Sequence, residues 1–129
     1  MADMKRFALT AVVAAALPLL AACGGDSGSD SDTTLPDADV QVIAVDGIAW
    51  NSDSYSASAG EVTILGRNES SLPHNLYLVA PDGSQLPQFI DLPGRGDADV
   101  IDVDLEAGEY TIVCLIPGHA NMTATLTVN

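Results

Sequence analysis

Four side chains in the second half of the chain are of types that bind transition metals: His74, Cys114, His119 and Met122. Three of them fall within nine residues, in the run Cys114-Leu-Ile-Pro-Gly-His119-Ala-Asn-Met122. Two imidazoles, a thiolate and a thioether form the ligand set of a trigonal copper site with a weak axial methionine. Soft sulfur ligands favour Cu(I), whereas imidazoles accept both oxidation states. The sequence therefore predicts one copper ion whose site needs little rearrangement on electron transfer.

Each of these residues also has an ordinary structural interpretation when it is taken alone. His74 could be a surface residue, and Cys114 a small buried hydrophobe. Met122 could fill a gap in the core, and His119, which follows Pro-Gly, could be a plain turn residue. A lone cysteine in an exported protein is buried and inert, an intermolecular bridge or a metal ligand. Three ligand types within one short run favour the metal site.

Short alternating or β-branched runs recur every ten residues or so from position 40 to the end, separated by Gly, Pro, Asn and Asp. No segment has a helical pattern longer than about two turns. The spacing predicts an all-β fold, a Greek-key antiparallel β-sandwich of seven to eight strands. The candidate strands are Val40–Val45, Tyr55–Ala57, Val62–Gly66, Asn75–Ala80, Leu86–Ile90, Val100–Leu105, Glu109–Cys114 and Thr123–Val128.

The expected strand Glu109–Cys114 ends next to the loop that carries His119. Because side chains alternate between the two faces of a strand, Tyr110, Ile112 and Cys114 share one face. If that face is buried, the thiol points inward at the end of a strand, beside the loop. This position suits a metal ligand.

Residues 1–22 have the pattern of an export signal. Lys5 and Arg6 give a positively charged start, and an apolar run follows from Phe7 to Leu20. The next residues complete Leu20-Ala21-Ala22-Cys23, which fits a lipobox. Cleavage there would leave Cys23 as the lipidated first residue. The alternatives are an ordinary signal peptide or a transmembrane anchor, although roughly 14 apolar residues fall short of the ~20 that span a bilayer.

Residues 23–39 consist mainly of Gly, Ser and Asp, so they bury too little apolar surface to fold and are expected to form a flexible tether. Residues 40–129 then form one compact domain. A lipid on Cys23 would anchor that domain to the outer face of the cytoplasmic membrane, or in the periplasm.

The chain is strongly acidic, with 18 acidic and four basic residues. Without residues 1–22 it keeps two basic groups, Arg67 and Arg95, against 17 acidic ones, a net charge of −15. Such a charge repels nucleic acid and anionic lipid. It favours either a protein partner that is basic at the contact or simply solubility in a salty medium.

The run from Glu109 to Val128 resembles the ligand loop between the last two strands of the cupredoxins, the blue-copper proteins such as azurin, plastocyanin and auracyanin. Further upstream, Ala59-Gly60-Glu61-Val62-Thr63, then Asn68, and then His74-Asn75 resemble another stretch of the same family. The resemblance spans about residues 40–129, and the combined motif is more specific than a C-x4-H pattern alone.

The resemblance implies that His74, Cys114, His119 and Met122 hold the copper. It also implies that Asn75 forms a hydrogen bond that steadies the ligand loop. One feature departs from the family: two residues separate His119 from Met122, where the azurin-like pattern has three. A tighter loop could weaken, lengthen or remove the bond to Met122 and would alter the reduction potential.

A mononuclear site without substrate turnover is expected, because a binuclear centre needs a second thiolate and a catalytic copper needs further histidines. The leading hypothesis is a monomeric, extracytoplasmic electron carrier whose partner is a redox protein such as a cytochrome or an oxidase. Two alternatives remain: a copper-binding module for delivery or buffering during oxidase assembly, and a metal-free adhesive β-sandwich.

Overall fold

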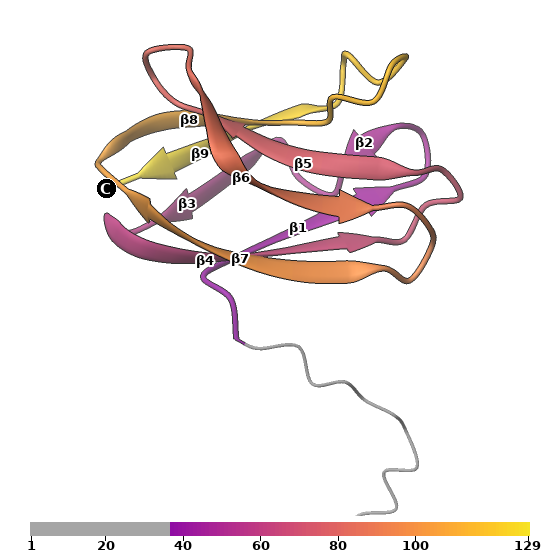
Figure 1. Ribbon diagram of the computed structural model, residues 1–129, viewed down its shortest axis with the longest axis horizontal. Coiled ribbons are helices and arrows are strands. Elements are labelled where there is room, and N and C mark those ends of the chain that lie inside the picture. Colours follow the sequence, from indigo (N-terminus) through magenta and orange to yellow (C-terminus); the bar gives the residue numbers. More distant parts are fainter. Residues whose placement is uncertain (1–36) are drawn as a thin grey trace, which may run out of the picture. The chain divides into compact units, whose positions relative to one another are not determined.

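Nine short strands in two packed sheets make up the part of the chain that the computed structural model describes, residues 37–129 (Figure 1). The predicted export signal and the lipidation site at Cys23 lie outside these residues, as does most of the predicted tether. Within residues 37–129, no helix is long and apolar enough to cross a membrane. The strands are β1 (Val40–Val45), β2 (Ala49–Trp50), β3 (Ser54–Ala57), β4 (Gly60–Asn68), β5 (His74–Val79), β6 (Gln85–Leu92), β7 (Ala98–Leu105), β8 (Gly108–Val113) and β9 (Thr123–Val128).

Both sheets are mixed. One has the strand order β2-β1-β4-β7 and the other the order β3-β9-β8-β5-β6. β1 runs parallel to β4 and β3 runs parallel to β9, whereas the remaining pairs are antiparallel. Parallel neighbours need a crossover connection. Between β1 and β4 the chain supplies one by passing through β3, which belongs to the opposite sheet.

The all-β sandwich class is confirmed, with two corrections. The expectation of purely antiparallel sheets is wrong for the β1–β4 and β3–β9 pairs, because alternation along a strand reports which face is buried and not the direction of its neighbour. The strand number is nine rather than seven or eight, because β2 has only two residues and is too short to show any alternation.

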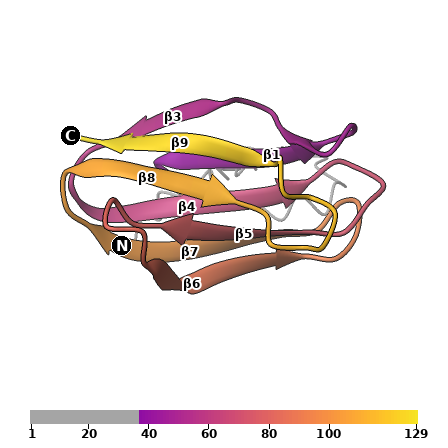
Figure 2. The same cartoon turned by 90° about the horizontal axis from the view of Figure 1, so that it is seen from above.

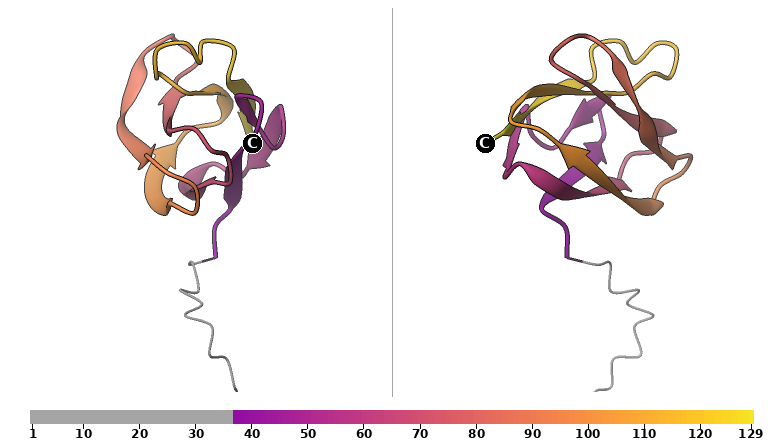
Figure 3. Two further views of the ribbon diagram at one scale, coloured as in Figure 1. Left: turned by 90° about the vertical axis from the view of Figure 1, so that its right-hand side faces the viewer. Right: turned by 60° about the vertical axis from the view of Figure 1, so that its left-hand side comes forward.

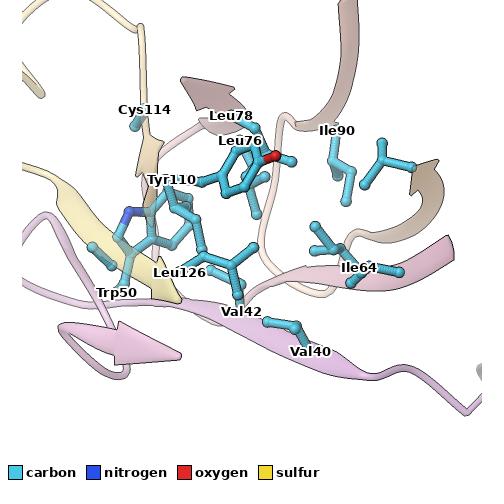
Figure 4. Close-up of a cluster of buried hydrophobic side chains, with 14 of the residues drawn as sticks. Val40, Val42, Trp50, Ile64, Leu76, Leu78, Ile90, Tyr110, Cys114 and Leu126 are labelled. Atoms are coloured by element: carbon cyan, nitrogen blue, oxygen red, sulfur yellow. The ribbon is translucent and has the colours of Figure 1, made fainter. Parts of the chain in front are cut away.

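The core lies between the sheets and is built from alternate residues of each strand. In β9, for example, Ala124, Leu126 and Val128 are buried while Thr123 and Thr127 are exposed. Figure 4 shows side chains from both sheets meeting in this layer. Full burial of a large aliphatic side chain contributes roughly 1.5–3 kcal/mol. The strand pattern that the sequence predicts is therefore also the source of most of the stability.

The two sheets approach closely at Gly66 of β4. A Cβ atom at this position would lie 3.0 Å from Cδ1 and 3.1 Å from Cγ2 of Ile90, a fully buried residue of β6. These separations are tighter than ordinary van der Waals contact, so any larger residue here would require the Ile90 side chain to shift.

The connections that carry the predicted ligands lie at one end of the sandwich. The loop between β8 and β9 and the segment between β4 and β5 are both found at the end opposite the C-terminus (Figures 1 and 2). Along one flank β6 and β7, which belong to different sheets, run side by side (Figure 3). The scaffold thus brings two segments together that are about 40 residues apart in the sequence.

Candidate metal centre

His74 is the first residue of β5 and is fully buried. It follows Pro73, which has a fixed φ and no backbone N–H, so strand pairing can begin only at His74. The ring is fixed from one side, because its Nε2 lies 2.7 Å from Oγ of Ser70. Its Nδ1 faces the opposite way, toward Cys114.

Cys114 directly follows the last residue of β8 and continues the inward-facing series begun by Tyr110 and Ile112. All three side chains are buried, as the alternation predicts, and Cys114 is 4% exposed. Figure 4 places it at the edge of the core. The thiol is therefore shielded from solvent and aimed at the site.

The loop that follows Cys114 is shaped by backbone hydrogen bonds. The His119 N–H donates to the carbonyl of Ile116 at 3.0 Å, and the Met122 N–H donates to the carbonyl of His119 at 2.9 Å. Gly118 has a φ of 92°, which favours glycine at the third position of the turn. The Cys114 N–H closes the loop by donating to the Met122 carbonyl at 3.2 Å.

Three ligand atoms converge at this end of the sandwich. Sγ of Cys114 lies 3.9 Å from Nδ1 of His74 and 3.5 Å from Nδ1 of His119, and the ligand atoms of the three residues all lie within 4.8 Å of one another. His119 is 7% exposed. Metal bonds of about 2.0 Å to nitrogen and 2.3 Å to sulfur, opened by about 110–120°, would place the two ligand atoms about 3.5–3.7 Å apart. The donor set and its spacing fit a single transition-metal ion.

Met122, the fourth predicted ligand, ends the same loop. Its side chain is 1% exposed, and its backbone is hydrogen-bonded to both Cys114 and His119. The structure thus places the residue next to Cys114 and His119. Its role as an axial ligand stays a prediction.

Asn75 links β5 to the ligand loop. Its Oδ1 accepts a hydrogen bond from the N–H of Leu115 at 2.7 Å, and Leu115 is the first loop residue after the cysteine. A bond of this kind holds the two ligand-bearing segments in register.

The electrostatic setting keeps the imidazole of His74 neutral. Burial lowers its pKa below the ordinary value of 6.5, and the neighbouring ring of His119 lowers it further. Burial has this effect because it disfavours the charged form. A neutral imidazole offers a lone pair, so the site is ready to bind a cation near neutral pH.

Two further residues lie next to the ring of His74. The ring centroid of Trp50, 7% exposed, lies 6.4 Å away at an interplanar angle of 50°. The second is Ser70, in contact with Nε2, which the sequence did not identify as part of the site. The available signal was a small hydroxyl residue four positions before a predicted ligand, which is too common to single out.

Comparison with models of known protein families finds no match, and the same holds for a search of curated proteins. Solved structures do match. A Na-dithionite reduced auracyanin from the photosynthetic bacterium Roseiflexus castenholzii is 16% identical, with a TM-score of 0.63 over 74% of this chain and 99% of the auracyanin. A purple cupredoxin from Nitrosopumilus maritimus is 22% identical, with a TM-score of 0.53 over 70% of this chain and 100% of the other.

A third match is the reduced Cu(I) form, at pH 4, of an amicyanin mutant. It is 19% identical, with a TM-score of 0.55 over 74% of this chain and 87% of the amicyanin. At these identities the likeness concerns the fold, and the described residues of this chain therefore have the fold of the cupredoxins.

Proposed function

We propose that this protein is an extracytoplasmic electron carrier in which one copper ion, bound by His74, Cys114 and His119, alternates between Cu(I) and Cu(II). The observation that carries the proposal is the convergence of two imidazole nitrogens and one thiol sulfur within 4.8 Å, all on buried residues. Met122 is proposed as the weak axial ligand. The matched amicyanin, described in a Cu(I) form, supports copper as the metal.

The ligand chemistry favours copper over harder cations. Thiolate and imidazole ligands select copper and zinc, and a site with two histidines, one cysteine and a weak axial methionine is diagnostic of blue copper. No carboxylate is part of the ligand group found within residues 37–129. Calcium and magnesium would require oxygen ligands.

The surroundings of the site favour electron transfer over substrate turnover. Both histidines of the chain already belong to this centre, so none is left to build a second, catalytic copper site. Hydrogen bonds hold the loop and both ligand segments in place, which limits rearrangement between oxidation states. The site is therefore suited to carrying one electron.

The surface at this end suits brief docking. Leu72 and Leu115 flank the ligand segments and are 40% and 48% exposed. A small apolar contact of this kind is typical of transient redox encounters. We propose a redox protein such as a cytochrome or an oxidase as the partner, basic around the contact, with the monomeric carrier held at the membrane by a lipid on Cys23.

Addition of Cu(II) to the purified chain tests the proposal. We expect an intense thiolate-to-copper absorption near the red end of the visible range, with one copper bound per chain. Cys114→Ser should abolish the band, whereas Cys23→Ser, which removes the other cysteine, should leave it unchanged. A colourless mixture in the presence of Cu(II) would contradict the proposal.

Rapid mixing then separates electron transfer from copper delivery. Fast bleaching of the band by a reduced cytochrome, with copper retained, is expected for a carrier. Slow bleaching together with ready transfer of copper to an apo-acceptor would instead indicate delivery or buffering.

A further inference from the structure

A chain of three buried polar side chains lies behind the candidate centre. Asn68, the last residue of β4, is fully buried, Ser70 is 1% exposed, and His74 is fully buried. Their side chains are joined by hydrogen bonds of 2.9 Å, between Asn68 and Ser70, and 2.7 Å, between Ser70 and His74. The direction of each bond can be worked out from the groups around it.

The orientation of the Asn68 amide is set by two backbone carbonyls. Its Nδ2 lies 2.7 Å from the carbonyl oxygen of Leu72 and 3.0 Å from that of Leu92, and both oxygens can only accept. Its Oδ1 accepts the N–H of Ser70 at 2.8 Å. Exchange of the amide nitrogen and oxygen would break all three bonds, so Oδ1 must face Ser70.

The hydroxyl of Ser70 has a single hydrogen to donate. Besides Asn68 Oδ1, the hydroxyl oxygen lies 3.1 Å from the Leu72 carbonyl oxygen, so two atoms that can only accept compete for that hydrogen. The same oxygen accepts the N–H of Leu72 at 3.2 Å. With its hydrogen given to either of these acceptors, the hydroxyl meets His74 as an acceptor, and the imidazole donates across the 2.7 Å contact.

We propose that Asn68 and Ser70 fix His74 in the tautomer that is protonated at Nε2. The lone pair then lies on Nδ1, the nitrogen 3.9 Å from Cys114 Sγ. Asn68 and Ser70 are thus positioning residues that select the ligand atom before any metal arrives. The part of this inference that concerns copper rests on the proposed function.

A committed tautomer has a direct consequence for metal binding. A histidine ligand usually donates its second ring nitrogen to a fixed acceptor, which sets the orientation of the ring and raises its basicity. Here the acceptor is a side-chain hydroxyl that is itself held by Asn68. Loss of such a partner typically costs about 10- to 100-fold in metal affinity.

Nitrogen NMR on the metal-free chain tests the tautomer directly. In long-range ¹H–¹⁵N spectra of the full chain at neutral pH, His74 should show a protonated Nε2 and an unprotonated Nδ1. Ser70→Ala should give a measurable share of the Nδ1-protonated form, and Ser70→Thr, which keeps the hydroxyl, should restore the wild-type pattern. The exposed neighbour provides a matched control, and Ser71→Ala should change nothing.

Copper competition with a chelator provides a second readout. Ser70→Ala should raise the copper dissociation constant about 10- to 100-fold, whereas Ser70→Thr and Ser71→Ala should stay close to wild type. Wild-type His74 protonated at Nδ1 would overturn the inference, even if Ser70→Ala fails to fold. An unchanged tautomer and copper affinity in folded Ser70→Ala would do the same. A wild-type chain that binds no copper would contradict the proposed function instead, and the NMR result on the tautomer would stand.

Discussion

Met122 is the last residue of the ligand loop, and it is buried, with 1% of its surface exposed. Only two residues separate it from His119, and the backbone between them forms a hydrogen-bonded turn. Whether its sulfur acts as an axial ligand therefore depends on the details of this short turn, and a substitution can decide it.

Met122→Leu should leave the fold intact and raise the reduction potential. The exchange nearly conserves volume and should cost less than ~1.5 kcal/mol of stability. Three ligands are enough for Cu(I), whereas Cu(II) gains more from a fourth, so loss of the axial ligand weakens binding of Cu(II) more than of Cu(I), even though sulfur as a ligand type favours Cu(I). A tenfold effect corresponds to about 59 mV for one electron, and we expect a rise of about that size by voltammetry. An unchanged potential would show that Met122 packs without binding.

The lowered pKa of His74 predicts a pH dependence for the metal-free protein. The unfolded chain takes up a proton at this histidine near pH 6.5, whereas the folded chain does so only at lower pH. The free energy of unfolding should therefore fall as the pH drops below about 6.5, and this loss should end once the folded-state pKa is passed.

Urea unfolding of the metal-free chain at about pH 7.5 and about pH 5.5 measures this effect. His74→Gln should show a smaller loss between the two pH values, because the titrating group is absent. The comparison with this variant removes the contribution of the carboxylates, which is common to both proteins. Equal losses in the two proteins would contradict the prediction.

At this scale, the sequence allowed the candidate ligands to be predicted but not their hydrogen-bond partners. The chain has two histidines and one cysteine beyond position 23, so few combinations of residues could form a site with imidazole and thiolate ligands. Ser70 is different, because serine is common and its role depends on the orientation of Asn68, whose amide donates to the Leu92 carbonyl 24 residues further along the chain. A contact between such distant residues forms only in the folded chain, so local sequence does not predict it.

Among the elements, strand positions followed from the sequence more readily than strand partners. Val40–Val45 and Thr123–Val128 are strands over the predicted residues, because clear alternation marks a strand with one buried face. The parallel pairing of β3 with β9 joins residues 54–57 to residues 125–128, and local periodicity carries no information at that separation. β2 was missed because two residues form no pattern.

The bond between Asn75 and the Leu115 N–H is the element-level link across the site, and its loss should loosen the ligand loop. Asn75→Ala should lower the free energy of unfolding by about 0.5–1.5 kcal/mol, the usual net value of one hydrogen bond. It should also speed the release of copper to a chelator. Asn75→Asp keeps an acceptor oxygen and should behave more like wild type. Identical release rates in all three proteins would argue against this role.

For the molecule as a whole, net charge governs encounter with partners. The chain has a formal charge of −14, and within the described residues its two arginines lie near acidic groups, Arg67 near Glu69 and Arg95 near Asp46. Long-range attraction should therefore guide a basic redox protein toward it and repel an acidic one.

Stopped-flow kinetics at varied salt concentration tests this expectation. The rate constant for reduction by a basic cytochrome should fall by about tenfold or more between low and physiological salt, because screening shortens the reach of the charges. Reduction by an acidic cytochrome should be slow at low salt and should speed up as salt is added. Rates independent of salt for both would show that charge does not guide docking.

The position of Trp50 gives the chain an intrinsic optical reporter. It is the single tryptophan, and its indole ring lies 6.4 Å from the ring of His74. An excited indole this close to Cu(II) loses its energy to the ion, so fluorescence should fall as the metal is added and recover when a chelator withdraws it. The titration should reach its end at one equivalent, which would count the binding sites in unlabelled protein.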